Sequence, residues 1–413
     1  MKLTGPFTQI LPLAGLPLKG AITDDQLQII TNGGVLTDNG RIVAAADFEK
    51  LRKDHPKAEI QEIEGDHVLL PGFTDCHTHI CFAGNRAKDY ALRIAGKSYL
   101  EIAKAGGGIW DSVLQTRQAS EKELAALLKQ RVDRHVREGV TTIEVKSGYG
   151  LNAEQELKQL RAIRSAAKTV SADLVPTCLA AHILPRDFSG TASVYLEYLL
   201  SYVLPRVKKE NLAARVDIFV EVSAFSTPDA AQYLRAAKQM GFDITVHADQ
   251  FTTGGSEVAI AVGAASADHL EAATEKEINE LAASDTVAVV LPGASLGLGI
   301  GLAPARKLLD AGACLAIASD WNPGSAPMGD LLVQAAVLSA YEKLTNAETF
   351  AGLTFRAAKA LNLTDRGSLE KGKLADMQAY PCKDYREILY HQGKLKPVQV
   401  WKSGNQCPMT NPR

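Results

Sequence analysis

The sequence has few cysteines and no long apolar run, and both absences narrow the classes of protein that it can encode. The six cysteines among 413 residues show no spacing typical of a disulfide framework. We therefore expect free thiols in a reducing compartment and a cytoplasmic protein. No apolar stretch reaches the length that crosses a bilayer, and the first residues lack the apolar segment of a secretory signal, so we expect no membrane association.

The chain also lacks an excess of either charge. It carries 45 Lys and Arg against 47 Asp and Glu, which gives a formal net charge of −2. Without a basic surplus or a dense Lys/Arg run, we expect no binding to nucleic acid or to an anionic membrane. Hydrophobic residues make up 46% and charged residues 22%, as is ordinary for a globular protein. This length accommodates one large domain and a small accessory domain.

From Gly72 onward, short apolar segments alternate with amphipathic ones, which predicts strands separated by helices. The predicted strands are residues 71–79, 141–146, 174–181, 216–222, 243–247, 264–269, 286–291 and 314–319. Nearly continuous apolar strands that alternate with helices indicate a parallel sheet covered on both faces. Eight such units predict an α/β fold of the (β/α)8 TIM barrel type, with the active site at the carboxyl ends of the strands.

Both ends of the chain depart from this alternation. Residues 35–43 surround an Asn39-Gly40 pair, which predicts a β-hairpin, and residues 367–380 and 398–402 also have strand character. A lone hairpin is marginally stable. We therefore expect residues 1–70 and 367–413 to form one small β-sandwich-like domain beside a barrel of residues 71–366.

Four histidines and one aspartate lie at the predicted ends of barrel strands. His77 and His79 point to one face of an extended segment, because side chains alternate along a strand. His247, His269 and Asp320 end three later strands. Only nine histidines occur in the chain, so chance is a poor account of four at these positions. Neutral imidazoles and one carboxylate suit a hydrolytic divalent ion, which can lower the pKa of a bound water to about 7.

The motifs around these residues resemble those of the amidohydrolase superfamily, and most closely its imidazolonepropionase branch. They are Pro71-Gly72-Phe73-Thr74-Asp75-Cys76-His77-Thr78-His79, Gly84-Asn85-Arg86, Ala105-Gly106-Gly107-Gly108-Ile109, Glu144-Val145-Lys146-Ser147-Gly148-Tyr149-Gly150, Ala180-Ala181-His182, His247-Ala248-Asp249-Gln250 and Ser319-Asp320-Trp321-Asn322-Pro323-Gly324-Ser325. The most specific of these motifs are Lys146-Ser147-Gly148-Tyr149-Gly150 and Asp320-Trp321-Asn322-Pro323-Gly324-Ser325. The resemblance spans essentially the whole chain. It implies metal-dependent hydrolysis of the ring C–N bond of 4-imidazolone-5-propanoate to N-formimidoyl-L-glutamate, a step of histidine degradation.

The resemblance also implies the metal ligands. They are His77, His79, His247 and Asp320. Many superfamily members hold a second metal through a carboxylated lysine on the fourth strand, but residues 216–222 contain no lysine. Lys146 ends the second strand and is expected to form a structural ion pair. We therefore expect one divalent or trivalent ion per chain, zinc or iron, because imidazole and carboxylate accept both metals.

Catalytic and substrate-binding roles follow from the same resemblance. Asp320 is placed to accept the proton of the attacking water, and His269 to orient the nucleophile or polarise the ring carbonyl. A propionate substituent needs a receptor, which Arg86 offers through its bidentate fork. The remaining substrate-binding residues are Tyr149, His182, Gln250, Asn322, Gly324 and Ser325. Some relatives carry Glu where this chain has Gln250, and because an amide cannot act as a general base, that duty falls to Asp320.

Two other functions are compatible with the same residues. One is hydrolysis of another cyclic amide or amidine, or deamination of an aminopurine, although deamination needs no carboxylate receptor such as Arg86. The other is a non-catalytic barrel used in assembly, which would be expected to lose metal ligands, whereas this chain keeps all four. As partners we expect a small-molecule substrate and a second copy of the chain in a symmetric homodimer.

Overall fold

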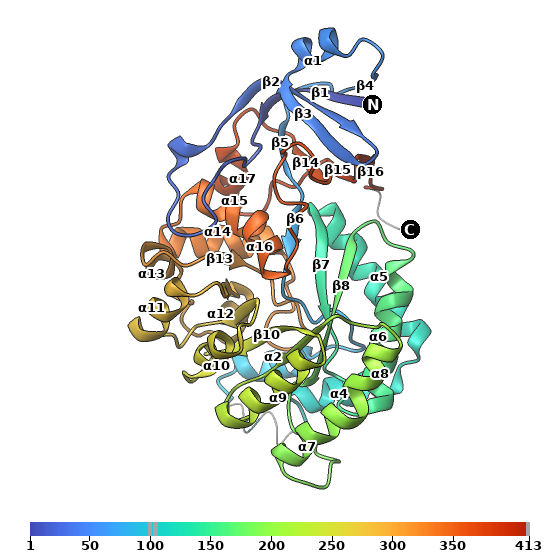
Figure 1. Ribbon diagram of the computed structural model, residues 1–413, viewed down its shortest axis with the longest axis vertical. Helices are drawn as coiled ribbons and strands as arrows, with labels where there is room; N and C mark the ends of the chain where they lie inside the picture. Colours follow the sequence, from blue (N-terminus) through green and yellow to red (C-terminus); the bar gives the residue numbers. More distant parts are fainter. Residues whose placement is uncertain (98–100, 102–105, 410–413) are drawn as a thin grey trace.

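The protein is described by a computed structural model that covers residues 1–97, 101 and 106–409. Ala105, from the Gly-rich motif 105–109, lies outside the described residues. The described strands form two eight-stranded sheets, one from the middle of the chain and one from its two ends. Figure 1 shows the second sheet at the top, beyond the point where β5 leads into β6. Within the described residues, no helix is both long and apolar enough to cross a membrane.

The first sheet is a parallel barrel whose strands follow one another in chain order. They are β6 (Phe73–Asp75), β7 (Val140–Lys146), β8 (Asp173–Ala181), β9 (Arg215–Ile218), β10 (Asp243–Ala248), β11 (Ser266–His269), β12 (Val287–Val290) and β13 (Leu315–Ile317). Beyond β6 and β13, Thr78 pairs in parallel with Trp321, and the Asp320 N–H donates to the His77 carbonyl at 3.0 Å. These bonds join the first strand to the last at their carboxyl ends. The predicted (β/α)8 barrel is confirmed.

Each predicted strand overlaps an observed one, and most are shorter than expected. The largest difference is in residues 71–79. Pro71 ends β5 (Val68–Pro71) in the other sheet, and only Phe73–Asp75 form β6. The chain crosses between the sheets at Gly72, where an added Cβ would lie 2.4 Å from Thr141 Oγ1. A side chain at this position would therefore collide with β7.

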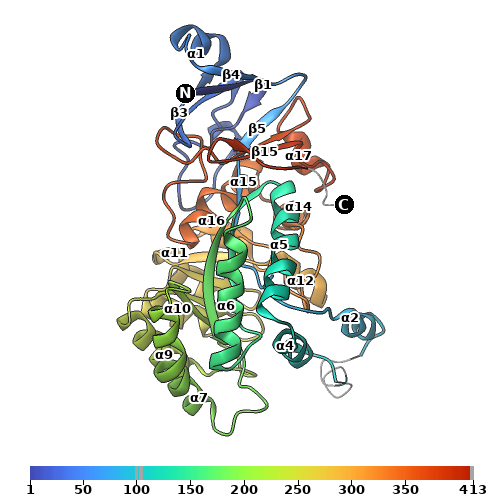
Figure 2. The ribbon, with the colours of Figure 1, turned by 90° about the vertical axis from the view of Figure 1, so that its right-hand side faces the viewer.

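Helices cover the outside of the barrel and the small sheet. They are α1 (Phe48–Asp54), α2 (Ala87–Ile94), α4 (Ile109–Gln118), α5 (Glu121–Arg137), α6 (Ala153–Ala167), α7 (Ala192–Tyr198), α8 (Leu204–Lys209), α9 (Thr227–Gln239), α10 (Gly255–Val262), α11 (Glu275–Ala283), α12 (Pro292–Leu298), α13 (Ala305–Asp310), α14 (Leu331–Glu342), α15 (Asn346–Leu353), α16 (Phe355–Ala360) and α17 (Arg386–Tyr390). α5 begins at a capping box, in which Ser120 accepts from the Glu123 N–H and the Glu123 carboxylate accepts from the Ser120 N–H. Figure 2 shows α5 and α6 side by side along the outer face of the barrel.

The second sheet joins the two ends of the chain. Its strands are β1 (Lys2–Ile10), β2 (Ile30–Asp38), β3 (Arg41–Asp47), β4 (Glu59–Glu62), β5, β14 (Met377–Tyr380), β15 (Gln399–Lys402) and β16 (Asn405–Gln406). β14 pairs with β5 and so brings residues about 300 positions apart into one sheet. The predicted hairpin links β2 and β3, and Asn39 and Gly40 adopt φ values of 47° and 77°. Positive φ at both positions is what a two-residue hairpin turn of type I′ requires.

Candidate active site

Five side chains from four parts of the barrel converge at its carboxyl end. His77 and His79 come from the segment after β6, His247 from β10, His269 from β11 and Asp320 from the residues after β13. All five are buried. His79 Nε2 lies 3.2 Å from His77 Nε2, 3.1 Å from His247 Nε2 and 3.3 Å from Asp320 Oδ1. The structure therefore brings together the residues that the sequence places at the ends of barrel strands.

The spacing of these atoms fits one metal ion. Ligands held tetrahedrally at about 2.05 Å from zinc lie about 3.3 Å from one another. The three distances from His79 Nε2 are close to that value, and the distance from His77 Nε2 to Asp320 Oδ1 is 3.6 Å. The match concerns the donor atoms themselves, so it does not depend on the resemblance of the sequence motifs.

Carboxylates behind two of the histidines determine which ring nitrogen faces the centre. His77 Nδ1 lies 2.6 Å from Asp268 Oδ2, and His247 Nδ1 lies 2.8 Å from Asp217 Oδ2. A carboxylate acceptor keeps the proton on Nδ1, so Nε2 presents a lone pair. His79 Nε2 carries at most one proton and can donate to only one of these two nitrogens, so at least one of the short contacts brings two lone pairs together. A cation between them resolves this conflict.

Burial prepares the histidines to bind metal. It lowers the pKa of His79 to about 3 and that of His247 to about 4, and it lowers the pKa of His77 well below its usual value. Near neutral pH these imidazoles are therefore uncharged, and a metal ion does not have to displace protons from them.

We expect the metal-free protein to lose stability as the pH falls from 7 to 5. Unfolded histidines take up protons near pH 6.5, whereas His79 and His247 stay neutral in the folded state. The unfolded state then binds more protons, so each of these residues removes about 2 kcal/mol of stability at pH 5. The pKa of His182 is also lowered by burial, whereas carboxylates raise the pKa of His135 and His269 despite burial and partly oppose the trend.

The measurement is the free energy of unfolding of chelator-treated protein at pH 7 and pH 5. His79→Gln should reduce the pH dependence because it removes one buried neutral imidazole. His391→Gln is the matched control, since His391 is exposed. Equal pH dependence in the parent and His79→Gln would contradict the assignment.

Asp320 is held in an unusual backbone conformation and oriented by its neighbours. Its φ of 49° lies in the left-handed region, which non-glycine residues rarely adopt and which is concentrated at functional sites. Asn322 Nδ2 donates to Asp320 Oδ2 at 2.9 Å, and Ser325 Oγ donates to the same oxygen at 3.3 Å. These bonds leave Oδ1 directed at the histidines. Burial raises the pKa of Asp320, which favours a carboxylate that can take up a proton.

His269 reaches the same centre from β11. Its ligand atom and those of His77 and Asp320 lie within 4.8 Å of one another. His269 Nδ1 lies 3.5 Å from Glu271 Oε2, and Ser295 Oγ donates to Glu271 Oε1 at 3.1 Å. The φ of His269 is 92°, again in the left-handed region. The side chain is thus close enough to act on a group bound at the centre.

Of the predicted substrate-binding residues, four lie against His79 or Asp320: Tyr149, His182, Asn322 and Ser325. The His182 ring stacks on the His79 ring, with centroids 5.4 Å apart, and Tyr149 lies 5.6 Å from the His182 ring. An added Cβ on Gly324 would lie 2.1 Å from Arg86 Nη1, so glycine allows the guanidinium to lie against this turn. Asn322 and Ser325 contact Asp320, as described above. Gln250 is buried three residues after His247.

Sequence reasoning missed the carboxylates that support these residues. Asp217 and Asp268 lie behind His247 and His77, within 2.8 Å of their Nδ1 atoms, and Asp89 accepts from Arg86 Nε at 2.8 Å. A signal for two of them was present: Asp217 is an acidic residue within an apolar strand, and Asp268 directly precedes His269. Buried charges of this kind are nearly always paired.

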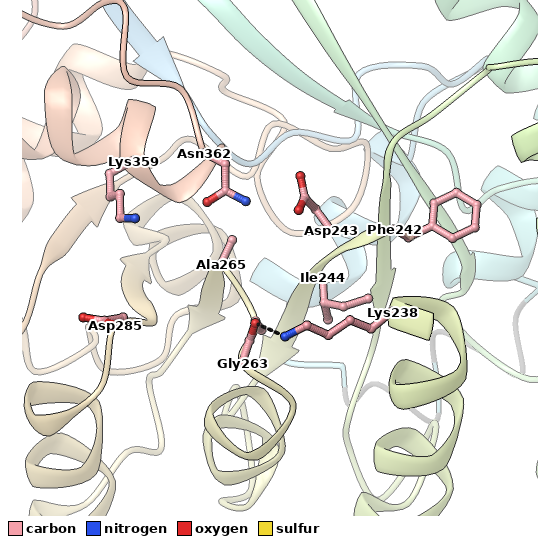
Figure 3. Close-up of a pocket in the computed structure, with 10 residues that line it drawn as sticks. Lys238, Phe242, Asp243, Ile244, Gly263, Ala265, Asp285, Lys359 and Asn362 are labelled. Carbon is pink, nitrogen blue, oxygen red and sulfur yellow. Dashed lines mark hydrogen bonds between the residues drawn. The ribbon is translucent and has the colours of Figure 1, made fainter. Parts of the chain in front are cut away.

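A cavity lies at the opposite end of the barrel. It has a volume of about 190 Å³ and is lined by residues that include Lys238, Asp243, Asp285 and Lys359 (Figure 3). Asp243 begins β10, whereas His247 lies near the end of that strand. The cavity therefore contains none of the converging histidines and is not the candidate active site.

Comparison with known proteins agrees with the geometry. A model of the amidohydrolase family matches residues 68–407. The chain belongs to the amidohydrolase family. This amidohydrolase is 40% identical over 382 residues to an imidazolonepropionase of Bacillus mycoides (strain KBAB4), a match that covers 92% of this chain and 90% of the relative. An imidazolonepropionase of Bacillus cereus (strain AH187) is 39% identical over 382 residues, and this match also covers 92% of this chain and 90% of the relative. The chain is therefore a hydrolase of the imidazolonepropionase branch.

Solved structures support the fold of this amidohydrolase. A triazine hydrolase variant is similar with a TM-score of 0.76 and 16% identity, covering 98% of this chain and 94% of that one. An adenosine deaminase from Xanthomonas campestris with bound zinc has a TM-score of 0.70 and 18% identity, covering 98% of this chain and 92% of that one. At these identities the likeness concerns the fold alone.

Proposed function

We propose that this amidohydrolase hydrolyses the ring C–N bond of 4-imidazolone-5-propanoate to N-formimidoyl-L-glutamate, a step of histidine degradation. The observation that carries the proposal is the convergence of three imidazole nitrogens and one carboxylate at distances suited to one metal ion. The choice of substrate rests on the relatives named imidazolonepropionase, which are about 40% identical over nine tenths of the chain. Loss of the ring's ultraviolet absorbance, with N-formimidoyl-L-glutamate identified as product, tests it.

The residues divide the chemistry among them. A divalent ion bound by His77, His79, His247 and Asp320 would act as a Lewis acid and lower the pKa of water to about 7. Asp320 accepts the proton of the water that adds to the ring carbonyl carbon. His269 hydrogen-bonds to the carbonyl oxygen as negative charge develops on it. When the C–N bond breaks, Asp320 returns the proton to the departing nitrogen, and the carbonyl carbon becomes a carboxylic acid that releases its remaining proton to solvent.

Arg86 is the proposed receptor for the propionate. Its Nε donates to Asp89, which leaves the two Nη groups for a bidentate contact with a carboxylate. Tyr149 and His182, whose rings lie beside His79, are proposed to contact the imidazolone ring. Gln250 is proposed to hydrogen-bond to it as a neutral amide, together with Asn322, Gly324 and Ser325 from the turn after Asp320.

Arg86→Ala should lower kcat/KM by about 30- to 1000-fold, because it removes a charge-assisted bidentate contact worth on the order of 2–4 kcal/mol. Folding and metal content should be preserved. The matched comparison is a 4-imidazolone without the propionate, which parent and variant should process equally slowly. If the variant processes the propionate-bearing ring as well as the parent does, the receptor lies elsewhere.

We propose one ion per chain, zinc or iron, because imidazole and carboxylate suit both. All six cysteines are free and buried, which favours the reducing cytoplasm. We also propose a homodimer, because two-fold dimers are the commonest oligomers among soluble proteins. The two sheets support a small domain of residues 1–70 and 367–413 beside a barrel of residues 71–366.

A further inference from the structure

One buried lysine lies beneath the candidate metal site and contacts the supports of two of its ligands. Lys146, the last residue of β7, is fully buried. Its Nζ lies 2.8 Å from Asp217 Oδ2 and 3.8 Å from Asp268 Oδ2. These are the same two oxygens that face His247 Nδ1 and His77 Nδ1. A single ammonium group therefore contacts both carboxylates behind the metal-facing histidines.

The local charge balance explains why this position needs a cation. Glu144 Oε2 lies 2.8 Å from Lys146 Nζ, so three buried carboxylates surround one ammonium. Arg215 is a further cation near this group, and its Nε lies 3.7 Å from Glu144 Oε1. Buried like charges without a partner repel one another and favour protonation. Without Lys146, Asp217 and Asp268 would lose the cation that holds both of them in place.

Other hydrogen bonds fix the two carboxylates only in part. Asp217 Oδ1 accepts from the backbone N–H groups of Ile218, at 2.7 Å, and His247, at 3.2 Å. Asp268 Oδ2 accepts from Thr245 Oγ1 at 3.0 Å. Neither set includes a second cation. Although burial alone would lower the pKa of Lys146, Asp217, Glu144 and Asp268 raise it, so the lysine stays charged.

We propose that Lys146 is a positioning residue of the metal site, which fixes the orientation of His77 and His247 together by holding Asp268 and Asp217. This role goes beyond the structural ion pair that we expected from the sequence, because it makes the affinity of the site for metal depend on the lysine. The inference rests on the proposed metal site, but not on the identity of the substrate.

The first test is the affinity of metal-free protein for Zn²⁺, measured in competition with a chromogenic chelator. Changes in groups that orient metal-bound histidines typically cost about 10- to 100-fold in affinity, and Lys146→Gln should fall in that range. Glu144→Gln is the matched control: it removes a buried charge from the same cluster but leaves both histidine-bound carboxylates in place. It should change the affinity less than threefold. Equal losses of Zn²⁺ affinity in the two variants would show that Lys146 has only a general structural role.

The second readout is the visible absorption of the Co²⁺-loaded protein, which reports ligand geometry. Lys146→Gln should shift the bands and Glu144→Gln should leave them unchanged. A double-mutant cycle then tests whether Lys146 acts through Asp217. In an Asp217→Asn background, Lys146→Gln should lower the affinity for Zn²⁺ by a smaller factor than it does in the parent. An equal cost in both backgrounds would show that Lys146 does not act through Asp217.

A further pair of variants tests the inference if Lys146→Gln does not fold. Because one lysine holds both carboxylates, the affinity losses of Asp217→Asn and Asp268→Asn should not multiply in the double variant. Independent, multiplicative losses would overturn the inference. Failure of the parent itself to bind Zn²⁺ or Co²⁺ would overturn the proposed metal site instead, so the two failures are distinguishable.

Discussion

Asp320→Asn is expected to lower kcat by at least about 10⁴-fold, the upper range for removing a positioned proton-transfer group. The substitution also removes the one carboxylate among the proposed ligands and so weakens metal binding. Asp320 Oδ1 lies 3.3 Å from His79 Nε2, while Oδ2 is held by Asn322 and Ser325. An amide in this place keeps the shape of the side chain but cannot accept the proton.

Asp249→Asn is the matched control for this prediction. Asp249 is a buried aspartate that follows β10, and its φ of 53° resembles the 49° of Asp320. Its Oδ1 accepts from the N–H groups of Gly255 and Ser256, at 2.8 and 3.2 Å, so it is bonded to the first turn of α10 rather than to the histidines. This control should retain activity within tenfold of the parent. Substantial turnover by Asp320→Asn at full metal occupancy would remove Asp320 as the base.

His269→Ala is expected to lower kcat by about 10²- to 10⁴-fold while the metal content stays unchanged. The reason is its position: Glu271 lies behind Nδ1 at 3.5 Å, and the ring reaches the same centre as His77 and Asp320. The measurement pairs kcat with elemental analysis of each preparation. His391→Ala controls for loss of an imidazole at an exposed position. Near-parental rates in His269→Ala would exclude it from the mechanism, and loss of metal would make it a ligand.

The sequence predicted the barrel and the converging residues because both depend on local periodicity. Side chains alternate along an extended segment, so His77 and His79 had to share a face. Parallel strands end at one edge, so His247 and Asp320 had to lie near them. The Asn39-Gly40 hairpin was likewise predictable, since its turn needs positive φ at both positions.

The parts that sequence could not predict depend on contacts between distant segments. Asp268 lies 191 residues from His77, and no local pattern indicates that the two share a hydrogen bond. The contact of Arg86 with the turn at Gly324 has the same character. Lys146 was expected to form an ion pair, but its partners on β9 and β11 emerge only once the barrel closes. The supporting shell of the site is therefore a property of the fold rather than of any motif.

The most direct test of the account is a titration of metal-free protein with Zn²⁺ or Fe²⁺ that follows both bound metal and turnover of 4-imidazolone-5-propanoate. The account predicts that activity is absent without metal, rises in proportion to bound metal and stops rising at one ion per chain. Turnover by rigorously metal-free protein, a rise that continues to two ions, or no turnover at full occupancy would contradict it.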